Sequence, residues 1–232
     1  MEALLAVSRQ MPMLLRASVL NIELLLALVA IGFVVGTSVA LCQVYGGRTV
    51  RTISGVYEWV FRSIPALVLL FLFYFGPAQF GLRIAPFLAA GLALGLRSSA
   101  YQSQIFRGAI QSIPTGQLAA ARALGMSRMR AVITIILPQA LRLSLPGWSN
   151  EFSAVVKDTT LAYAVGLNEI MRAARVVYDR QYELAMPVLL AVALVFLLLT
   201  FAGNFILGGV ERRWHIPGTE TAGGGPQADR SR

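Results

Sequence analysis

Residues 114–142 read PTGQLAAARALGMSRMRAVITIILPQALR, and this stretch decides how the rest of the chain is understood. It contains four arginines, although the segments on either side of it are strongly apolar. Arginines between apolar segments are typical of cytoplasmic loops in membrane proteins, where positive charge accumulates. On spacing alone, an ordinary cytoplasmic loop and a specialised basic helix account for the stretch equally well.

The same stretch predicts a short helix with defined ends. Thr115 or Gly116 can cap its start after the opening proline, and residues 117–124 are good helix formers. Gly125 is expected to end the helix, and Pro138 to mark a second break. We therefore expect a short, exposed, basic helix, a glycine turn and re-entry into a membrane.

Composition places the whole chain in a bilayer. Of its 232 residues, 56% are hydrophobic and only 13% are charged, and the mean hydropathy is +0.67. Several uncharged runs reach the roughly 18 to 20 residues that cross a membrane as a helix. We predict an all-α, polytopic membrane protein. The net charge of +9 is explained by anionic lipid headgroups and cytoplasmic arginines, so we expect no nucleic-acid partner.

Residue usage excludes several kinds of chemistry. Cys42 is the sole cysteine and lies in an apolar run, so neither a disulfide nor a cysteine-based metal site can form within the chain. His215, the sole histidine, follows the last apolar segment and is interpreted as a solvated residue rather than a ligand or base. The sequence has no G-x-x-x-x-G-K-[ST] loop to hold nucleotide phosphates. We predict no catalytic residue, no metal site and no cofactor bound by this chain.

Five apolar segments are expected to cross the membrane: 24–42, 63–82, 84–113, 131–156 and 184–210. A short outer helix is expected within 167–182, where apolar residues recur at helical spacing. Gly46 to Arg51 should form a basic cytoplasmic connection. The N-terminus is not interpreted as a cleaved signal peptide, and the Gly-rich segment 217–232 is expected to be a disordered cytoplasmic tail.

The quoted stretch resembles the signature loop of ABC importer permeases, Glu-Ala-Ala-x3-Gly-x9-Ile-x-Leu-Pro. Six positions match in register: Ala120, Ala121, Gly125, Ile135, Leu137 and Pro138. Ala119 stands where the family usually has Glu, so an ion pair from that position to an ATPase is not available. The helix should persist, because Ala is the best helix former.

Three further segments are similar to the same family, within its polar amino acid group. Residues 62–65 read RSIP, like Arg-x-x-Pro, and residues 157–161 read KDTTL, like Lys-Asp-Thr-Ser-Leu. Residues 100–107 resemble Ala-Tyr-x-x-Glu-Ile-x-Arg, with Gln104 in place of the usual Glu. The resemblance covers about residues 14–213, which we expect to be one transmembrane domain.

This resemblance implies a membrane-spanning permease for polar amino acids such as histidine, glutamine, glutamate, arginine or opines. The implied partners are ABC ATPase subunits, which bind ATP and Mg²⁺, a second permease chain, and an extracytoplasmic amino-acid-binding protein. The signature helix would couple the ATPase to the spans through Gln117, Ala120, Ala121, Arg122, Leu124 and Gly125. With that loop inside and five spans, the N-terminus would lie outside and the C-terminus in the cytoplasm.

Two other functional classes fit the sequence less well. A gradient-driven transporter or channel for small polar solutes often shows two related halves and acids at the membrane midplane. We find no internal duplication, and this class leaves the basic signature unexplained. An intramembrane enzyme is disfavoured because the sequence has neither H-E-x-x-H nor G-x-S-x-G.

Arg97 interrupts the third apolar segment and invites two interpretations. Counting a helical rise of about 1.5 Å per residue from the expected helix ends places Arg97 and Glu151 at nearly the same depth. The two could form a structural ion pair. Alternatively, Arg97 could receive a substrate carboxylate while Asn150 or Glu151 meets the amino group, with Gln104 also on the pathway. A charge inside a span usually faces the bundle interior or a water-filled cavity.

Overall fold

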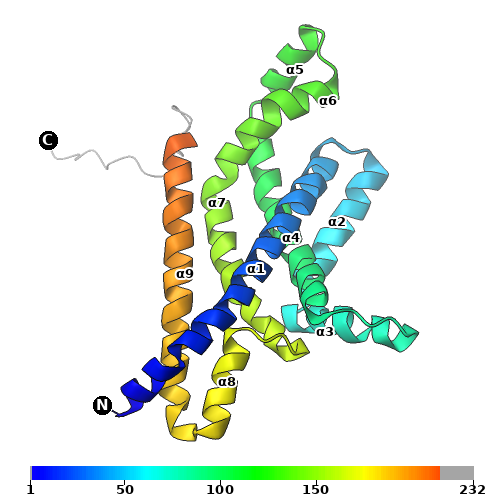
Figure 1. The fold of residues 1–232 in the computed structure, drawn as a ribbon. Coiled ribbons are helices and arrows are strands. Elements are labelled where there is room, and N and C mark those ends of the chain that lie inside the picture. Colours follow the sequence, from blue (N-terminus) through cyan, green and yellow to red (C-terminus); the bar gives the residue numbers. More distant parts are fainter. Residues whose placement is uncertain (1, 215–232) are drawn as a thin grey trace, which may run out of the picture.

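The computed structural model describes residues 2–214, with side chains from residue 6 onward, and every regular element in that part of the chain is helical. The elements in order are α1 (Glu2–Tyr45), α2 (Arg48–Ser63), α3 (Ala66–Phe75), η1 (Pro77–Phe80), α4 (Pro86–Ser112), α5 (Thr115–Ala123), α6 (Arg128–Ala131), η2 (Val132–Ile136), α7 (Leu137–Asp158), η3 (Thr159–Val165), α8 (Ile170–Arg180), η4 (Tyr182–Leu184) and α9 (Ala185–Trp214). Figure 1 shows α1 crossing the molecule obliquely, with α9 and α7 on one side and α2 and α3 on the other.

Helices α1 and α4 pack closely against each other. A Cβ on Gly32 would lie 2.1 Å from Gln102 Nε2, and one on Gly36 would lie 2.9 Å from the Ser99 carbonyl oxygen. Residues 32–36 read GFVVG, and small residues four apart let membrane helices approach closely. The polar residues of α4, including Ser99 and Gln102, are consequently buried against α1.

The second expected span differs from the prediction. The helix ends at Ser63, and α3 begins at Ala66 after a bend of 103° between α2 and the Ala66–Phe80 segment. Pro65 explains the bend, because it lacks an N–H and keeps the residue before it extended. Gly46 and Gly47 form the turn from α1, so Arg48 and Arg51 lie in the first turn of α2 rather than in a loop.

Pro138 does not break the chain as expected. A five-residue π-helical segment, η2, joins α6 to α7, and Pro138 lies in the first turn of α7. A π segment widens the backbone spiral, which accommodates a residue that has no N–H to donate. The helix therefore continues from Arg128 to Val165.

The N-terminal half of α1 packs against α8 and α9 at the end of the bundle opposite α5 (Figure 1). Asn21 joins these elements, because its Nδ2 donates to Thr159 Oγ1 and Glu169 Oε2, each at 3.1 Å, and its Oδ1 accepts from the Ile170 N–H. Glu169 is fully buried and caps α8 by accepting from the N–H groups of Met171 and Arg172. The first helix thus begins well before residue 24, where the first span was expected to start, and α8 confirms the short helix expected in 167–182.

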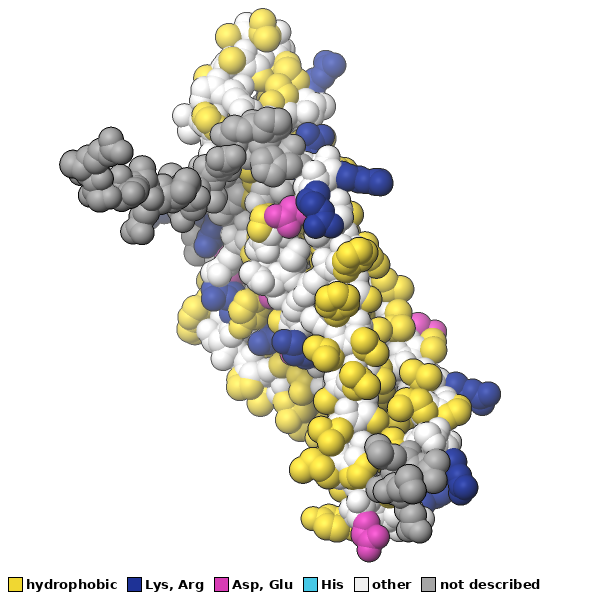
Figure 2. All heavy atoms as spheres, turned by 90° about the vertical axis from the view of Figure 1, so that its left-hand side faces the viewer, with side chains coloured by type: hydrophobic (Ala, Val, Ile, Leu, Met, Phe, Trp, Pro, Cys, Tyr) yellow, Lys and Arg dark blue, Asp and Glu magenta, His cyan; other side chains and the backbone are white. Residues whose placement is uncertain are grey.

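Three helical segments among the described residues are long and apolar enough to cross a membrane, Ala6–Tyr45, Arg128–Val165 and Tyr182–Trp214, and the bent pair α2–α3 gives a fourth. Hydrophobic side chains cover the lower part of the face on which α9 lies (Figure 2). Helix α4 has 27 residues but is more polar, because it carries its polar side chains inside the bundle. The number of five spans stays a prediction, and the tail 217–232 and His215 lie outside the described residues.

Candidate functional site

The signature stretch folds into a helical hairpin, α5 and α6, that projects from one end of the bundle (Figure 1). Thr115 or Gly116 was expected to cap α5, but neither does. Pro114 occupies the N-cap position and the helix starts at Thr115. Two backbone hydrogen bonds cap the C-terminal end of α5. The Met126 N–H donates to the Ala121 carbonyl at 3.1 Å and the Gly125 N–H to that of Arg122 at 3.0 Å, which is the Schellman arrangement.

Gly125 ends the helix because its φ is +84°, a left-handed conformation that favours glycine. A Cβ at this position would meet nothing within 4 Å in this chain. The glycine is therefore required by the turn, and the space outside it is open to another molecule.

The coupling residues predicted from the sequence divide between two faces of α5. Leu124 is 85% exposed, and Ala120 and Arg122 are exposed as well. Ala121 is buried, and Gln117 exchanges hydrogen bonds with Gln139 of α7 at 2.7 and 3.1 Å. One face of α5 is thus fixed to the bundle while the other, including a large apolar side chain, is presented outward.

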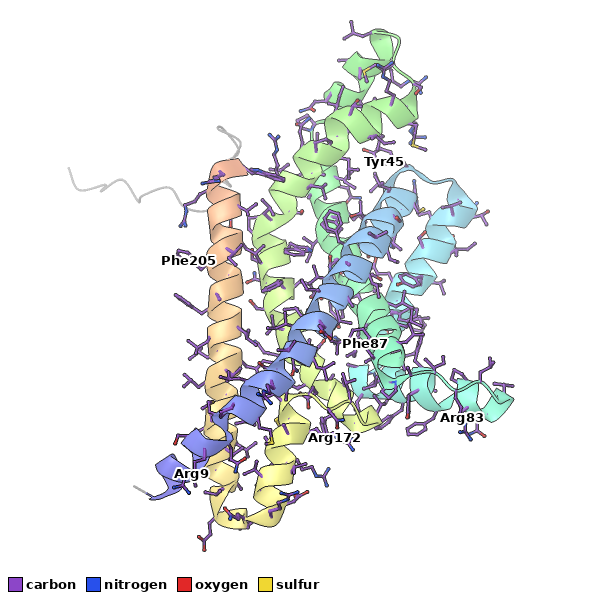
Figure 3. The ribbon with its side chains drawn as sticks, viewed as in Figure 1. Arg9, Tyr45, Arg83, Phe87, Arg172 and Phe205 are labelled. Carbon is purple, nitrogen blue, oxygen red and sulfur yellow. The ribbon has the colours of Figure 1, made fainter. Side chains whose placement is uncertain are left out.

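The hairpin also contacts the end of α1. The Arg128 guanidinium lies 5.4 Å from the centre of the Tyr45 ring, a cation–π distance. Figure 3 shows Tyr45 at the end of α1 nearest the hairpin. The base of α6 is therefore tied to α1 as well as to α7.

Arg97 pairs with Asp158, so the expected Arg97–Glu151 ion pair is wrong. Arg97 Nη1 donates to Asp158 Oδ2 at 2.8 Å, while Glu151 Oε1 accepts from Ser98 Oγ at 2.9 Å. The similar depth of Arg97 and Glu151 along their helices was predicted correctly, since Ser98, the residue after Arg97, donates a hydrogen bond to Glu151. The long arginine side chain, however, extends away from that level towards the end of α7.

Tyr101 lies between two guanidinium groups. Arg97 is 4.9 Å from the centre of its ring and Arg62, at the end of α2, is 5.1 Å from it. The Nε atoms of both arginines are buried and have no hydrogen-bond partner among the described residues. Two cations with unused donors thus converge on one aromatic ring inside the bundle.

The remaining pathway candidates separate. Asn150 is exposed, although it neighbours the partly buried Glu151 in α7. Gln104 instead donates to Glu58 of α2. Glu58 is 6% exposed and also accepts from Gln43 Nε2 at 2.7 Å and Arg107 Nη1 at 3.2 Å. The structure therefore brings Arg97 near Glu151 but places Gln104 in a different cluster.

Sequence reasoning missed Asp158, Glu58, Arg62 and Tyr101. Asp158 and Arg62 lie in the short segments that resembled the permease family, which was the signal that could have found them. Glu58 gave no such signal, because 48–63 was not expected to be a packed helix. Among the described residues, no group of three His, Cys, Asp or Glu side chains could hold a metal ion.

Residues 29–216 match the family described as binding-protein-dependent transport system inner membrane component. The chain belongs to this family. It is therefore a multi-pass inner-membrane permease, and because ATP hydrolysis in such systems is done by separate ATPase subunits, the chain is a transport subunit rather than an enzyme.

Relatives of the permease match over most of their length. The nopaline transport system permease protein NocM of Agrobacterium fabrum is 36% identical over 200 residues, covering 82% of this chain and 83% of NocM. The glutamine transport system permease protein GlnP of Escherichia coli is 33% identical over 207 residues, covering 88% and 94%. The crystal structure of an amino acid ABC transporter with histidines superposes with a TM-score of 0.80 at 31% identity, covering 90% of this chain and 97% of that one.

Proposed function

We propose that this permease carries a polar amino acid inward as the membrane-spanning subunit of an ATP-driven importer. The observation that carries the proposal is the α5–α6 hairpin, which presents Leu124 and Arg122 outward at one end of the bundle with the family's small residues in register. Relatives named for nopaline and glutamine transport support an amino acid as the substrate.

The exposed face of α5 is proposed to seat on an ABC ATPase that binds ATP and Mg²⁺. The other face is held by Gln139 and the buried Ala121, so movement of the hairpin would be passed to α7. Ala119 supplies no carboxylate for an ion pair with the ATPase. The proposed contact therefore depends on the shape of the exposed face of α5 and on its arginine side chains. A second permease chain and an external binding protein complete the proposed assembly.

The N-terminus is proposed to lie outside and α5 in the cytoplasm. The N-terminal end of α1 and the α5–α6 hairpin are at opposite ends of the bundle, and the end of α9 lies towards the hairpin (Figure 1). The arginines Arg212 and Arg213 in the last turn of α9 support this orientation, because positive charge accumulates on the cytoplasmic side.

Arg97 and Glu151 remain our candidates for contact with the substrate, with Asn150 beside them. A free amino acid carries a carboxylate that could accept from the unused donors of Arg97 and Arg62 across Tyr101. The amino group of the substrate would be met by Glu151. This carboxylate accepts a hydrogen bond from Ser98, the residue that follows Arg97. Gln104 is better explained as a partner of Glu58.

Transport by the reconstituted complex tests the proposal. The permease is assembled with its ATPase and binding protein in liposomes, and uptake of labelled arginine, glutamine, histidine and glutamate is followed. Uptake is expected only with ATP inside the compartment that holds the ATPase. Uptake driven by an ion gradient without ATP would instead support the gradient-driven alternative.

A further inference from the structure

A cavity of about 540 Å³ lies where the ends of three helices meet. Its lining comes from the last turn of α1, the first two turns of α2 and the last two turns of α4: Gln43, Val44, Arg51, Gly55, Arg107 and Gln111. It lies beside the turn between α1 and α2, at the end of the bundle nearer the hairpin, where Figure 3 labels Tyr45. The cavity is therefore at the level where a span ends and lipid headgroups begin.

The inner wall of this cavity is held in place by buried groups. Gln43 is 6% exposed, donates to Glu58 and to the Ser54 carbonyl, and accepts from Arg107 Nη1 at 2.7 Å. Arg107 uses only Nη1 in its hydrogen bonds to Gln43 and Glu58. Its guanidinium is fixed at the wall, with the other N–H groups left for a ligand.

The cavity carries an excess of positive charge. Glu58 pairs with both Arg107 at 3.2 Å and Arg62 at 3.4 Å, so one carboxylate serves two guanidinium groups. Arg51 is exposed at the rim and forms no ion pair among the described residues. The lining therefore holds two arginines and no acid, and an anion between Arg51 and Arg107 would neutralise the excess.

We propose that this cavity binds a phosphate group, supplied by the headgroup of an anionic phospholipid. Guanidinium groups bind phosphate oxygens through paired, charge-assisted hydrogen bonds. Basic pockets between membrane helices at the headgroup level are suited to anionic lipids. Val44 gives the cavity an apolar side, and Gln43 and Gln111 add amide donors. Free phosphate has the same chemistry, and the test separates the two sources.

Lipid binding to the purified full-length permease in detergent is measured by native mass spectrometry, with phosphatidylglycerol and phosphatidylcholine titrated separately. Arg51→Gln removes the rim charge. Gly55→Leu keeps every charge but fills the cavity, and a Cβ at Gly55 meets nothing within 4 Å, so the helix can carry it. Matched controls are Arg83→Gln, an exposed arginine away from the cavity, and Gly208→Leu, a glycine of α9 with equally open space.

Phosphatidylglycerol is expected to bind the natural chain more tightly than phosphatidylcholine does. Arg51→Gln and Gly55→Leu are each expected to weaken phosphatidylglycerol binding about fivefold, equivalent to about 1 kcal/mol. Both controls should bind as the natural chain does. Competition by millimolar inorganic phosphate, with no preference between the lipids, would support the phosphate site but assign it to free phosphate. Equal binding of both lipids by all five proteins, unaffected by inorganic phosphate, would overturn the proposal.

Discussion

Arg97 on α4 and Asp158 at the end of α7 form an ion pair with 2.8 Å between Nη1 and Oδ2. Each side chain is less than one-third exposed. The pair fixes the depth of α4 against α7, and it leaves Glu151, seven residues earlier in α7, bonded to Ser98 instead. The two acids of α7 therefore have different partners, Arg97 for Asp158 and Ser98 for Glu151.

Breaking the pair should destabilise the permease. Arg97→Gln or Asp158→Asn leaves a partly buried charge without its partner, at a cost of about 2 kcal/mol, typical of a hydrogen bond to a charged group. The double variant should regain part of that loss, and thermal unfolding of the purified chain measures it. Glu151→Gln serves as the control, because Glu151 bonds to Ser98 rather than to Arg97 and should show a much weaker energetic coupling to Arg97 than Asp158 does. Equal coupling of Arg97 to both acids would contradict this assignment.

Gly125 should be needed for coupling and not for insertion. A side chain at its φ of +84° costs roughly 1 to 2 kcal/mol, and Gly125→Leu would also fill the open space outside the turn. The variant should reach the membrane but lose substrate-stimulated ATP hydrolysis in the assembled complex. Gly209→Leu, in α9 with open space around it and outside the proposed ATPase contact, is the matched control. Full stimulation in Gly125→Leu would refute the coupling role.

Gly36 should tolerate no larger residue. A Cβ there would lie 2.9 Å from the Ser99 carbonyl, which is backbone and cannot swing aside. Gly36→Val is expected to separate α1 from α4 and to lower the free energy of unfolding by about 1 to 3 kcal/mol, as overpacking does. Gly108→Val in α4, where nothing lies within 4 Å, shares the loss of a helical glycine without the clash. Similar unfolding temperatures for the two variants would disprove the close α1–α4 contact.

Glu169 should make stability fall as pH rises. Burial raises the pKa of its carboxyl group, although the N–H of Met171, the amide of Asn21 and the N–H of Arg172 oppose the shift. A folded-state pKa above the unfolded value of about 4.3 means that the stabilisation is complete below that value and is lost as pH rises through the folded pKa. Glu169→Gln should flatten this part of the pH profile in thermal unfolding. An unchanged slope would mean that another group titrates.

The orientation can be read with reporter fusions. Fusions at Gly47 and at Gly218 should both report the cytoplasm, and a fusion near Arg83 should report the exterior. Arg83 follows η1, on the opposite side of the α2–α3 bend from the Gly47 turn (Figure 3). Any other combination would reverse or redraw the proposed topology.

Sequence patterns were sufficient where one local cause decides the structure. The uncharged run at 184–210 became α9, the periodic residues before Gln181 became α8, and Gly125 ends α5 as its position in the motif indicated. In each case the length, period or backbone requirement belongs to the segment itself.

Other features depend on contacts between distant segments and were missed for that reason. Helix α2 buries Ser54 and Glu58 against partners from α1 and α4, and no local pattern in the sequence indicates these distant contacts. The partner of Arg97 could not be found from depth alone, because rise along a helix fixes neither the direction nor the reach of a side chain. Pro138 was expected to break a helix, since the π segment that absorbs it has no clear sequence signal.

The uninterrupted helix through Pro138 has a mechanical consequence. From Arg128 beside the hairpin to Asp158 beside Arg97, the run is about 45 Å long at a rise of about 1.5 Å per residue. Had the proline broken it, the hairpin would be hinged to the bundle and its movements would dissipate at the joint. If the proposed coupling tilts this continuous helix at the hairpin, each degree of tilt would displace Asp158 by up to about 0.8 Å. A few degrees at α6 would therefore be enough to part Asp158 from Arg97.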